Sequence, residues 1–288
     1  MKKLLCFVSS LLLANLLLAQ STFTIGDLTY EVLANNKVSV IACDTSATVV
    51  NVPANVSYEG VDYDVITIGD NAFQYRVNIT SVHLPNGIVS IGNRAFYSCR
   101  NLTSLDLNGW NTSKATNLSR MFHYCASLPS LDVSNFVTSN VTNMNGMFAM
   151  CYKLTSLDLS NFNTSKVTDM GSMFANSDKL SYVNLSSFNT SNVTNMSNMF
   201  GNGESYGMSF TTLDLSNFNT SKVTNMSGMF QRCYKLISLN VGSFDLTNVT
   251  NMSNMFNEVY STCTITIDCN YQDKWLTVKP SNWTIECK

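Results

Sequence analysis

A long internal repeat constrains this chain more than any other feature of its sequence. The dipeptide Met-Phe begins at positions 121, 147, 173, 199, 229 and 255, so successive copies are 26, 26, 26, 30 and 26 residues apart. Two earlier Ala-Phe dipeptides, at 72–73 and 95–96, are 23 residues apart, and each follows an Ile-Gly pair. Fixed periods of this length are typical of solenoids, in which each repeat forms one coil of a stacked array.

The unit at 147–172 shows what one coil should contain. Leu157 and Leu159 alternate with polar residues, a period of two that predicts a short strand with one buried face. Further along, apolar residues recur at three- to four-residue steps and predict a short helical segment that packs inward. These are Val167, Met170, Met173 and Phe174. We therefore expect a leucine-rich-repeat-like solenoid with one short strand, a turn and a short helical segment in each 23–26-residue coil.

Two further consequences follow from the repeat. A single unit buries too few apolar side chains to offset the entropy of ordering its backbone, so the coils must be stabilised by stacking on one another. The one 30-residue spacing contains a four-residue insertion in the glycine-rich stretch 201–207. A stacked coil is expected to extrude such an insertion as a loop without a change in the neighbouring coils.

These motifs resemble a known family. Segments of the form Met-Phe-x-x-Cys-x-x-Leu-x-Ser-Leu-Asp-Leu-Ser-Asn-Phe-Asn-Thr-Ser-Lys-Val-Thr resemble the 26-residue bacterial surface-protein repeat. The Ile-Gly-x-x-Ala-Phe units at 68–73 and 91–96 resemble the leucine-rich repeats of the BspA family. The resemblance covers residues 67 to 257 and implies a secreted or surface-exposed repeat protein. For some members it implies adhesive binding to host matrix proteins or to other cells.

The two ends of the chain do not follow the repeat. A basic start, an apolar stretch and the small residue Ala19 predict a signal peptide at 1–19, and this apolar stretch is too short for a membrane-spanning helix. Short strand-like runs broken by Asn35-Asn36 and Glu59-Gly60 predict a β-rich N-terminal cap at 20–66. The solenoid is then expected at 67–257 and a C-terminal cap at 258–288, since an uncovered last coil would expose unpaired strand edges.

The composition argues against several function classes. Charged residues make up 12% of the chain and the formal net charge is -2. Binding to nucleic acid needs clustered Lys and Arg that contact phosphates, and the chain lacks such clusters. The two histidines, His83 and His123, fall at different repeat positions. They therefore give little support to a catalytic site in which a histidine base activates a nucleophile. Without a Cys-x-x-Cys motif or a histidine pair we expect no metal site, and we expect no cofactor.

One polar position per coil forms a candidate ligand-binding face. The residues on the outward side of the predicted strands are Asp106, Asp132, Asp158, Asn184, Asp214 and Asn240. Two residues before them lie Ser130, Ser156, Tyr182 and Thr212 in four of the coils. Like charges opposite one another across strands are unfavourable. The run of aspartates therefore indicates either simple screening by solvent or a strip that binds a cation or a protein or glycan ligand.

The cysteines divide into two groups. Cys99, Cys125 and Cys151 share one repeat position that other units fill with small residues, which is typical of a slot for a small buried side chain. Coil spacing would also permit one disulfide among these three. The candidates we favour for a disulfide are Cys263, Cys269 and Cys287 in the terminal segment, of which one must remain unpaired.

The leading interpretation is a secreted or cell-surface binding protein for a protein or glycan ligand, such as host matrix or another cell surface. It is expected to span no membrane, to bind no nucleic acid and not to be an enzyme. A second interpretation is a structural, self-associating surface or matrix protein, which the low charge and repetitive polar surface would permit. A remote third one is a secreted hydrolase that uses a carboxylate pair.

Overall fold

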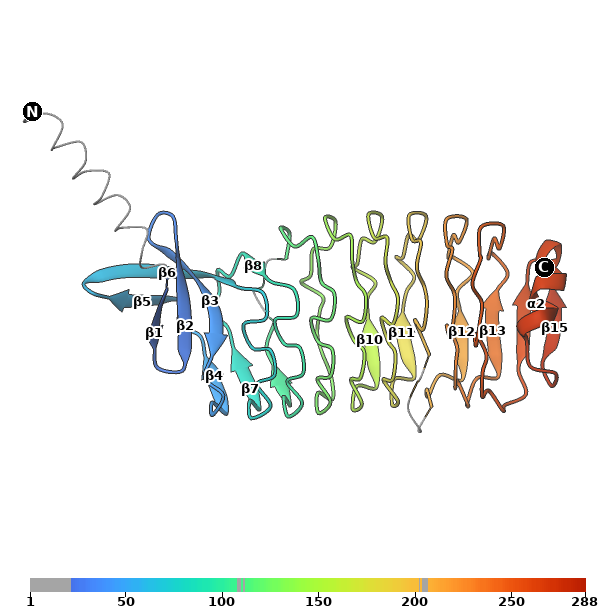
Figure 1. Ribbon diagram of the computed structural model, residues 1–288, viewed down its shortest axis with the longest axis horizontal. Coiled ribbons are helices and arrows are strands. Elements are labelled where there is room, and N and C mark those ends of the chain that lie inside the picture. Colours follow the sequence, from blue (N-terminus) through green and yellow to red (C-terminus); the bar gives the residue numbers. More distant parts are fainter. Residues whose placement is uncertain (1–21, 108–109, 111, 202, 204–206) are drawn as a thin grey trace, which may run out of the picture.

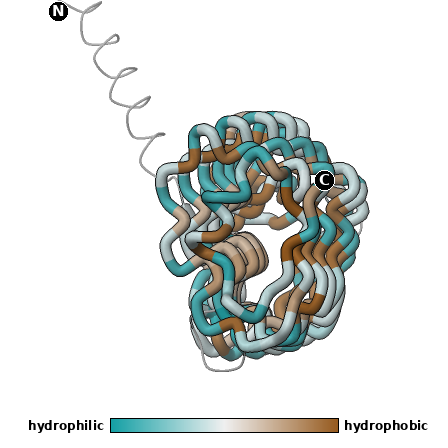
Figure 2. The backbone as a smooth tube through the Cα atoms, turned by 90° about the vertical axis from the view of Figure 1, so that its right-hand side faces the viewer, coloured by the Kyte–Doolittle hydropathy of each residue, from teal (hydrophilic) through white to brown (hydrophobic). Residues whose placement is uncertain are grey.

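The computed structural model describes residues 22–107, 110, 112–201, 203 and 207–288. Coils stack along one long axis from an N-terminal sheet to a C-terminal group of strands and a helix (Figure 1). A view along that axis shows successive coils superimposed on one another (Figure 2). The predicted leucine-rich-repeat-like solenoid is thereby confirmed. The predicted signal peptide, 1–19, lies outside the described residues.

The N-terminal residues form an antiparallel-rich sheet. Its strands are β1 (Thr22–Ile25), β2 (Leu28–Leu33), β3 (Lys37–Cys43), β5 (Asn55–Tyr58), β6 (Val61–Ile68) and β8 (Ser90–Ile91). The order is β1-β2-β3-β6-β5, and β8 pairs with β6. Asn35 and Asn36 have φ of 61° and 52°, and Glu59 has φ of 50°. These residues make the tight turns between strands, because Asn and a residue before Gly tolerate the left-handed region that such turns require.

The remaining strands are parallel and lie one per coil. They are β4 (Val49–Asn51), β7 (Ser81–His83), β9 (Ser104–Leu105), β10 (Ser156–Asp158), β11 (Tyr182–Asn184), β12 (Thr212–Asp214), β13 (Ser238–Val241), β14 (Thr264–Ile267) and β15 (Thr284–Cys287). Ser156 pairs with Tyr182, and Thr212 with Ser238, which is the 26-residue period of the sequence. Leu157 and Leu213 point inward, with 1% and 6% of their surface exposed.

The C-terminal residues continue this ladder and then cover it. β14 and β15 extend the parallel sheet beyond residue 257, and a 3-10 turn (η1, Cys269–Tyr271) and a helix (α2, Gln272–Val278) lie between them. Trp275 of α2 is fully buried beside Phe244 and Phe256 of the last coils. The helices of the described part are too short or too polar to cross a membrane.

The predicted helical segment of each coil is wrong, because turns replace it. In the described coils, alternate N–H groups donate to the next coil and the others donate three residues back. In the coil at 170–177, Met170, Ser172, Phe174 and Asn176 donate to the carbonyls of Asn195, Ser197, Met199 and Gly201. Met173, Ala175 and Ser177 donate to Met170, Ser172 and Phe174. Ser172 and Asn176 have φ of 56° and 58°, so the backbone leaves the helical region every fourth residue.

Aromatic columns fill the inside of the solenoid. Phe122, Phe148 and Phe174 stack with ring centroids 5.9 and 6.0 Å apart and planes within 14° of parallel. A second column includes Phe136 and Phe162, whose centroids are 6.2 Å apart. Both columns repeat at the coil spacing, since the same residue type returns at the same position in each coil. The three- to four-residue apolar spacing therefore reflects burial in consecutive turns instead of a helix.

Buried threonines join consecutive coils at a point where no strand forms. The Thr164 hydroxyl accepts a hydrogen bond from the N–H of Asn189 at 2.8 Å and donates one to the carbonyl of the same residue at 2.9 Å. Thr138 does the same for Asn163 of the following coil. One hydroxyl thus satisfies both backbone groups of a turn residue that would otherwise lack partners.

We predict that Thr164→Val lowers the free energy of unfolding by about 2 kcal/mol. The side chains are nearly equal in volume, but valine leaves the N–H and carbonyl of Asn189 without their partner. The control is Thr168→Val in the same coil. Thr168 is exposed, and its hydroxyl shares the Thr142 carbonyl with its own backbone N–H, so a loss below about 0.5 kcal/mol is expected. Denaturant unfolding measures both, and equal losses would contradict this role of Thr164.

Candidate functional site

The structure places the predicted polar face on the outer side of the coils. Ser156 and Asp158 are exposed on β10, and Thr212 and Asp214 are exposed on β12. Tyr182 of β11 is also exposed, with 59% of its surface accessible. Asn184 and Asn240 are half-buried, and Asp106 is exposed just after β9. The residues of the predicted face therefore point outward, but the degree to which they are exposed differs from coil to coil.

The face is interrupted at the coil that carries Ser130, Leu131 and Asp132. Ser130 and Asp132 are exposed but lie in no strand, so their predicted place on one is wrong. The reason lies in Pro129. At the equivalent position the N–H groups of Thr103 and Ser181 donate to the preceding coil at 2.9 and 3.0 Å, and proline has no N–H to donate. The strands before and after this coil consequently belong to separate sheets.

The acidic residues of the face have a structural role that the sequence reasoning missed. Asp158 Oδ1 accepts a hydrogen bond from the N–H of Ser160, two residues later, at 3.0 Å. Asp132, Asn184, Asp214 and Asn240 accept equivalent bonds at 2.9 to 3.2 Å. These side chains turn the backbone after β10, β11, β12 and within β13, and Asp132 does so at the equivalent position of its strandless coil. The carboxylate oxygen of Asp and the amide oxygen of Asn can both accept this hydrogen bond. Either residue can therefore occupy this position.

These hydrogen bonds also keep the carboxylates ionised. The backbone N–H of Ser134 is the main cause that lowers the pKa of Asp132, and the N–H of Ser160 does the same for Asp158. A hydrogen bond from Asn184 in the next coil further lowers the pKa of Asp158. Neither carboxyl has the raised pKa that a general acid requires.

We predict that Asp158→Asn leaves thermal stability at neutral pH almost unchanged, whereas Asp158→Ala lowers it, because only alanine removes the acceptor for Ser160. The lowered pKa means that ionised Asp158 stabilises the fold above its unfolded pKa of about 3.9, and that this contribution is lost as the pH falls through the lower folded value. The acid side of a stability profile should therefore be flatter for Asp158→Asn. A profile parallel to that of the wild type would contradict this contribution.

A groove opens in the face between β11 and β12. β11 pairs only with β10 and β12 only with β13, so the two strands present unpaired edges to each other. The groove has a volume of 450 Å³, and its lining includes Tyr182, Asn184, Thr212 and Asp214 of the predicted face. Val183, Leu185, Phe210 and Leu213 supply apolar lining that the sequence reasoning did not assign to a site.

The four-residue insertion accounts for the groove. It lies between the coils of β11 and β12, and on the opposite side these coils remain joined, since Thr224 donates to the carbonyl of Thr194 at 2.9 Å and Asn195 bridges to Asn225. The two coils are thus paired at 194–195 with 224–225 and separated at their strands, and Figure 1 shows the wider spacing between β11 and β12. The expectation that the insertion leaves its neighbours unchanged is wrong. The 30-residue spacing was the signal that could have located the groove.

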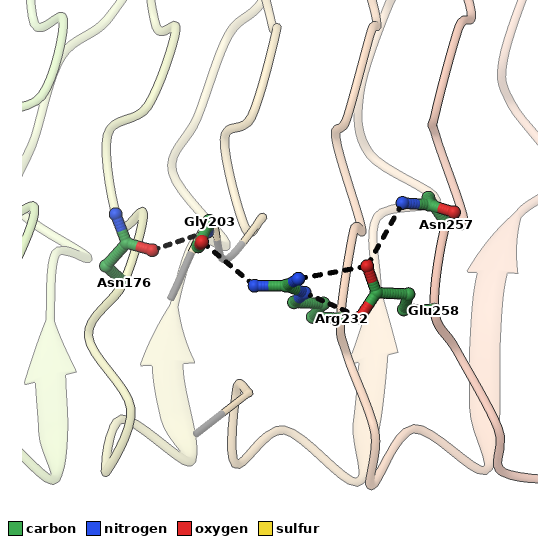
Figure 3. Close-up of polar contacts among 5 residues, drawn as sticks. All are labelled: Asn176, Gly203, Arg232, Asn257 and Glu258. Atoms are coloured by element: carbon green, nitrogen blue, oxygen red, sulfur yellow. Dashed lines mark hydrogen bonds and ion pairs between the residues drawn. The ribbon is translucent and has the colours of Figure 1, made fainter. Parts of the chain in front are cut away.

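Side-chain bonds hold the coils together around the insertion (Figure 3). The Asn176 carbonyl oxygen accepts from the N–H of Gly203 at 2.6 Å, and Arg232 donates to the carbonyl of Gly203 at 2.9 Å. Arg232 also forms a two-pronged ion pair with Glu258, at 3.0 and 2.9 Å. Gly203 is therefore tied to the coil before it and to the coil after it.

The cysteines of the repeat are free thiols. Cys99, Cys125 and Cys151 are buried, and each thiol donates to a main-chain carbonyl of a preceding coil at 3.1 to 3.3 Å. Burial raises the pKa of Cys99 and Cys151 to about 12. The disulfide considered among these three is therefore absent. In the terminal segment a disulfide joins Cys269 to Cys287 at a Cα separation of 5.2 Å, and Cys263 is a buried free thiol.

Comparison with known families identifies the repeat. The family described as "Mycoplasma protein of unknown function, DUF285" matches residues 92–208 and 158–268, which together make up more than half of the chain. The chain belongs to the DUF285 family. This match confirms the resemblance to the bacterial surface-protein repeats of BspA-like leucine-rich repeat proteins. No curated protein matches the sequence.

Two solved structures are similar to this chain, and the first of them shares its fold. A leucine-rich cell surface protein from Faecalibacterium prausnitzii is 20% identical, with a TM-score of 0.50 over 76% of this chain and 54% of that one. This DUF285 chain thus spans about half the length of that protein. A leucine-rich repeat protein from Bacteroides ovatus is 18% identical over 91% of this chain and 90% of that one, with a TM-score of 0.37.

Proposed function

We propose that this DUF285 protein is secreted or displayed at the cell surface and binds a protein or glycan. The binding surface is the outward polar face of its strands, here called the strand face. The groove between β11 and β12 carries the proposal. It combines unpaired strand edges, an apolar floor and the exposed ring of Tyr182 with the polar groups of Asn184, Thr212 and Asp214. Ligand sites are typically concave, with apolar lining and a few converging polar groups.

The surroundings of the groove fit a binding role better than a catalytic one. The carboxylates of the face act as acceptors in turns, and those of Asp132 and Asp158 have lowered pKa values. His123 stacks on Tyr97 at a centroid distance of 4.9 Å, well outside the groove lining. In the described part of the chain, His, Cys, Asp and Glu form no group that could hold a metal ion. We accordingly propose a non-enzymatic protein.

Export and the domain boundaries belong to the same proposal. The basic and apolar start at 1–19 supports export, and the similarity to a leucine-rich cell surface protein supports display outside the cell. We place the cap at 20–66, the solenoid at 67–257 and the terminal cap at 258–288. The ladder is continuous from β12 to β15, so the last of these segments completes the solenoid and closes its end.

We predict that the protein captures at least one member of a panel of host matrix proteins and glycans, and that Tyr182→Ala with Asp214→Asn weakens this binding about 10-fold or more. An exposed aromatic ring at the centre of a contact commonly supplies this much. The control is Thr194→Ala, an exposed side chain in the coil of β11 on the side where the coils remain paired. Surface plasmon resonance measures both.

Equal affinities for the two variants would contradict binding at the groove. Failure to bind any member of the panel, together with light scattering that grows with protein concentration, would favour the self-associating structural protein instead. The unpaired edges of β11 and β12 make this second role physically reasonable. A monodisperse monomer that binds a ligand argues against it.

A further inference from the structure

A second groove lies on the turns that precede the strands. Its volume is 760 Å³, and its lining comes from successive coils. The lining residues are Tyr124, Ala126, Ser127, Tyr152, Lys153, Asp178, Lys179, Ser209 and Lys235. None of them lines the groove between β11 and β12. The second groove therefore runs across successive coils on the turns just before the strands, and Ser209 directly precedes Phe210 of the first groove.

Basic side chains recur along this groove at one repeat position. Lys153 and Lys179 are 26 residues apart, and Lys235 occupies the same position two coils later, beyond the insertion. All three are exposed. Lys235 donates to the Ser209 hydroxyl at 3.2 Å, and Lys153 and Lys179 have no hydrogen bond or ion pair within the described residues. Like charges at the same position in adjacent coils repel each other, so an anionic ligand would relieve an unfavourable arrangement.

The lining of this groove carries more positive than negative charge. Glu258 is engaged by Arg232 in the ion pair of Figure 3. Asp178 is the one carboxylate in the lining, against three lysines. The Arg100 guanidinium adds a further positive charge 4.3 Å from the ring centre of Tyr124. In a chain with a formal net charge of -2, this groove is a locally positive strip.

Tyrosine rings lie next to the positive charges. Tyr124 and Tyr152 are half-buried, with centroids 5.7 Å apart and planes at 79°. An amphipathic ring offers a flat apolar face together with a hydroxyl. The Ser127 and Ser209 hydroxyls add donors and acceptors that suit ring hydroxyl groups of a sugar.

We propose that this second groove binds an acidic polysaccharide, with sugar rings against Tyr124 and Tyr152 and carboxylate or sulfate groups on Lys153, Lys179 and Lys235. A polymer fits better than a small molecule because the lining extends over successive coils and the lysines repeat along it. Multiple weak contacts along a rigid array then add up to useful affinity. No residue lines both grooves, so this proposal stands even if the groove between β11 and β12 binds nothing.

The test measures binding of the protein to polygalacturonate and to dextran sulfate by isothermal calorimetry at low salt. Neutral dextran, polyglutamate and single-stranded DNA are the comparison polymers. We expect binding to one or both acidic polysaccharides that weakens with added salt, and no binding to neutral dextran. Which of the two binds distinguishes uronate from sulfate as the anionic group. Absence of binding to both, or tighter binding to polyglutamate or DNA, would overturn the proposal.

A charge-matched pair of variants locates the site. The first variant combines Lys153→Gln, Lys179→Gln and Lys235→Gln, and the second combines Lys114→Gln, Lys166→Gln and Lys222→Gln at another exposed repeat position. Both lose three positive charges. The first should bind about 10-fold more weakly or worse, and the second within about 2-fold of the wild type, since the exposed lysine contacts are individually weak and act together. Equal losses would show attraction by overall charge only and would overturn the assignment to this groove.

The tyrosines provide an independent check that is not electrostatic. Tyr152→Ala should weaken binding of the same polysaccharide at every salt concentration, whereas Tyr182→Ala on the strand face should leave it unchanged. Circular dichroism confirms that each variant is folded. If Tyr152→Ala binds as the wild type does, the sugar rings do not contact this groove.

Discussion

Every coil of this protein depends on its neighbours to satisfy its backbone hydrogen bonds. Between the coil at 170–177 and the next, alternate N–H groups donate across to carbonyls 25 residues further on, and the Thr164 hydroxyl serves both backbone groups of Asn189. The phenylalanine columns require the same alignment, since Phe148 and Phe174 stack at 6.0 Å only when one coil lies directly on the next. A single spacing between coils therefore fixes the core and the outer face together.

Departures from this alignment create the features that distinguish one part of the surface from another. Pro129 removes one donor, and the strand of its coil is lost. The four-residue insertion separates β11 from β12 while Asn195 and Asn225 keep the coils joined on the far side. A perfectly regular solenoid would present a uniform face, so the irregular coils are the ones that give the surface distinct local features. The lysines at 153, 179 and 235 are a different kind of feature, because they occupy one repeat position and depend only on which residue type stands there.

The sequence predicted the repeat, its period and the inward Leu157 and Leu213, because stacking forces identical positions into register. It did not predict the turns that replace the helix, since the apolar spacing of Met170, Met173 and Phe174 fits both. Positive φ at Ser172 and Asn176 decides between them. Asn tolerates that conformation but does not require it, and Ser gives no indication of it. The sequence also predicted which polar residues face outward. The 30-residue spacing could have located the groove along the chain, but the extent to which two coils separate around an insertion is not encoded in any local pattern.

The dependence of each coil on its neighbours can be measured on one coil alone. A peptide of residues 147–172 contains a complete repeat with its phenylalanine, leucine and threonine positions. Circular dichroism and amide exchange of the peptide at low concentration should show a disordered chain, because all of its coil-to-coil bonds and ring contacts are missing. A monomeric peptide with protected amides would contradict the account, since its coil would then be stable without stacking.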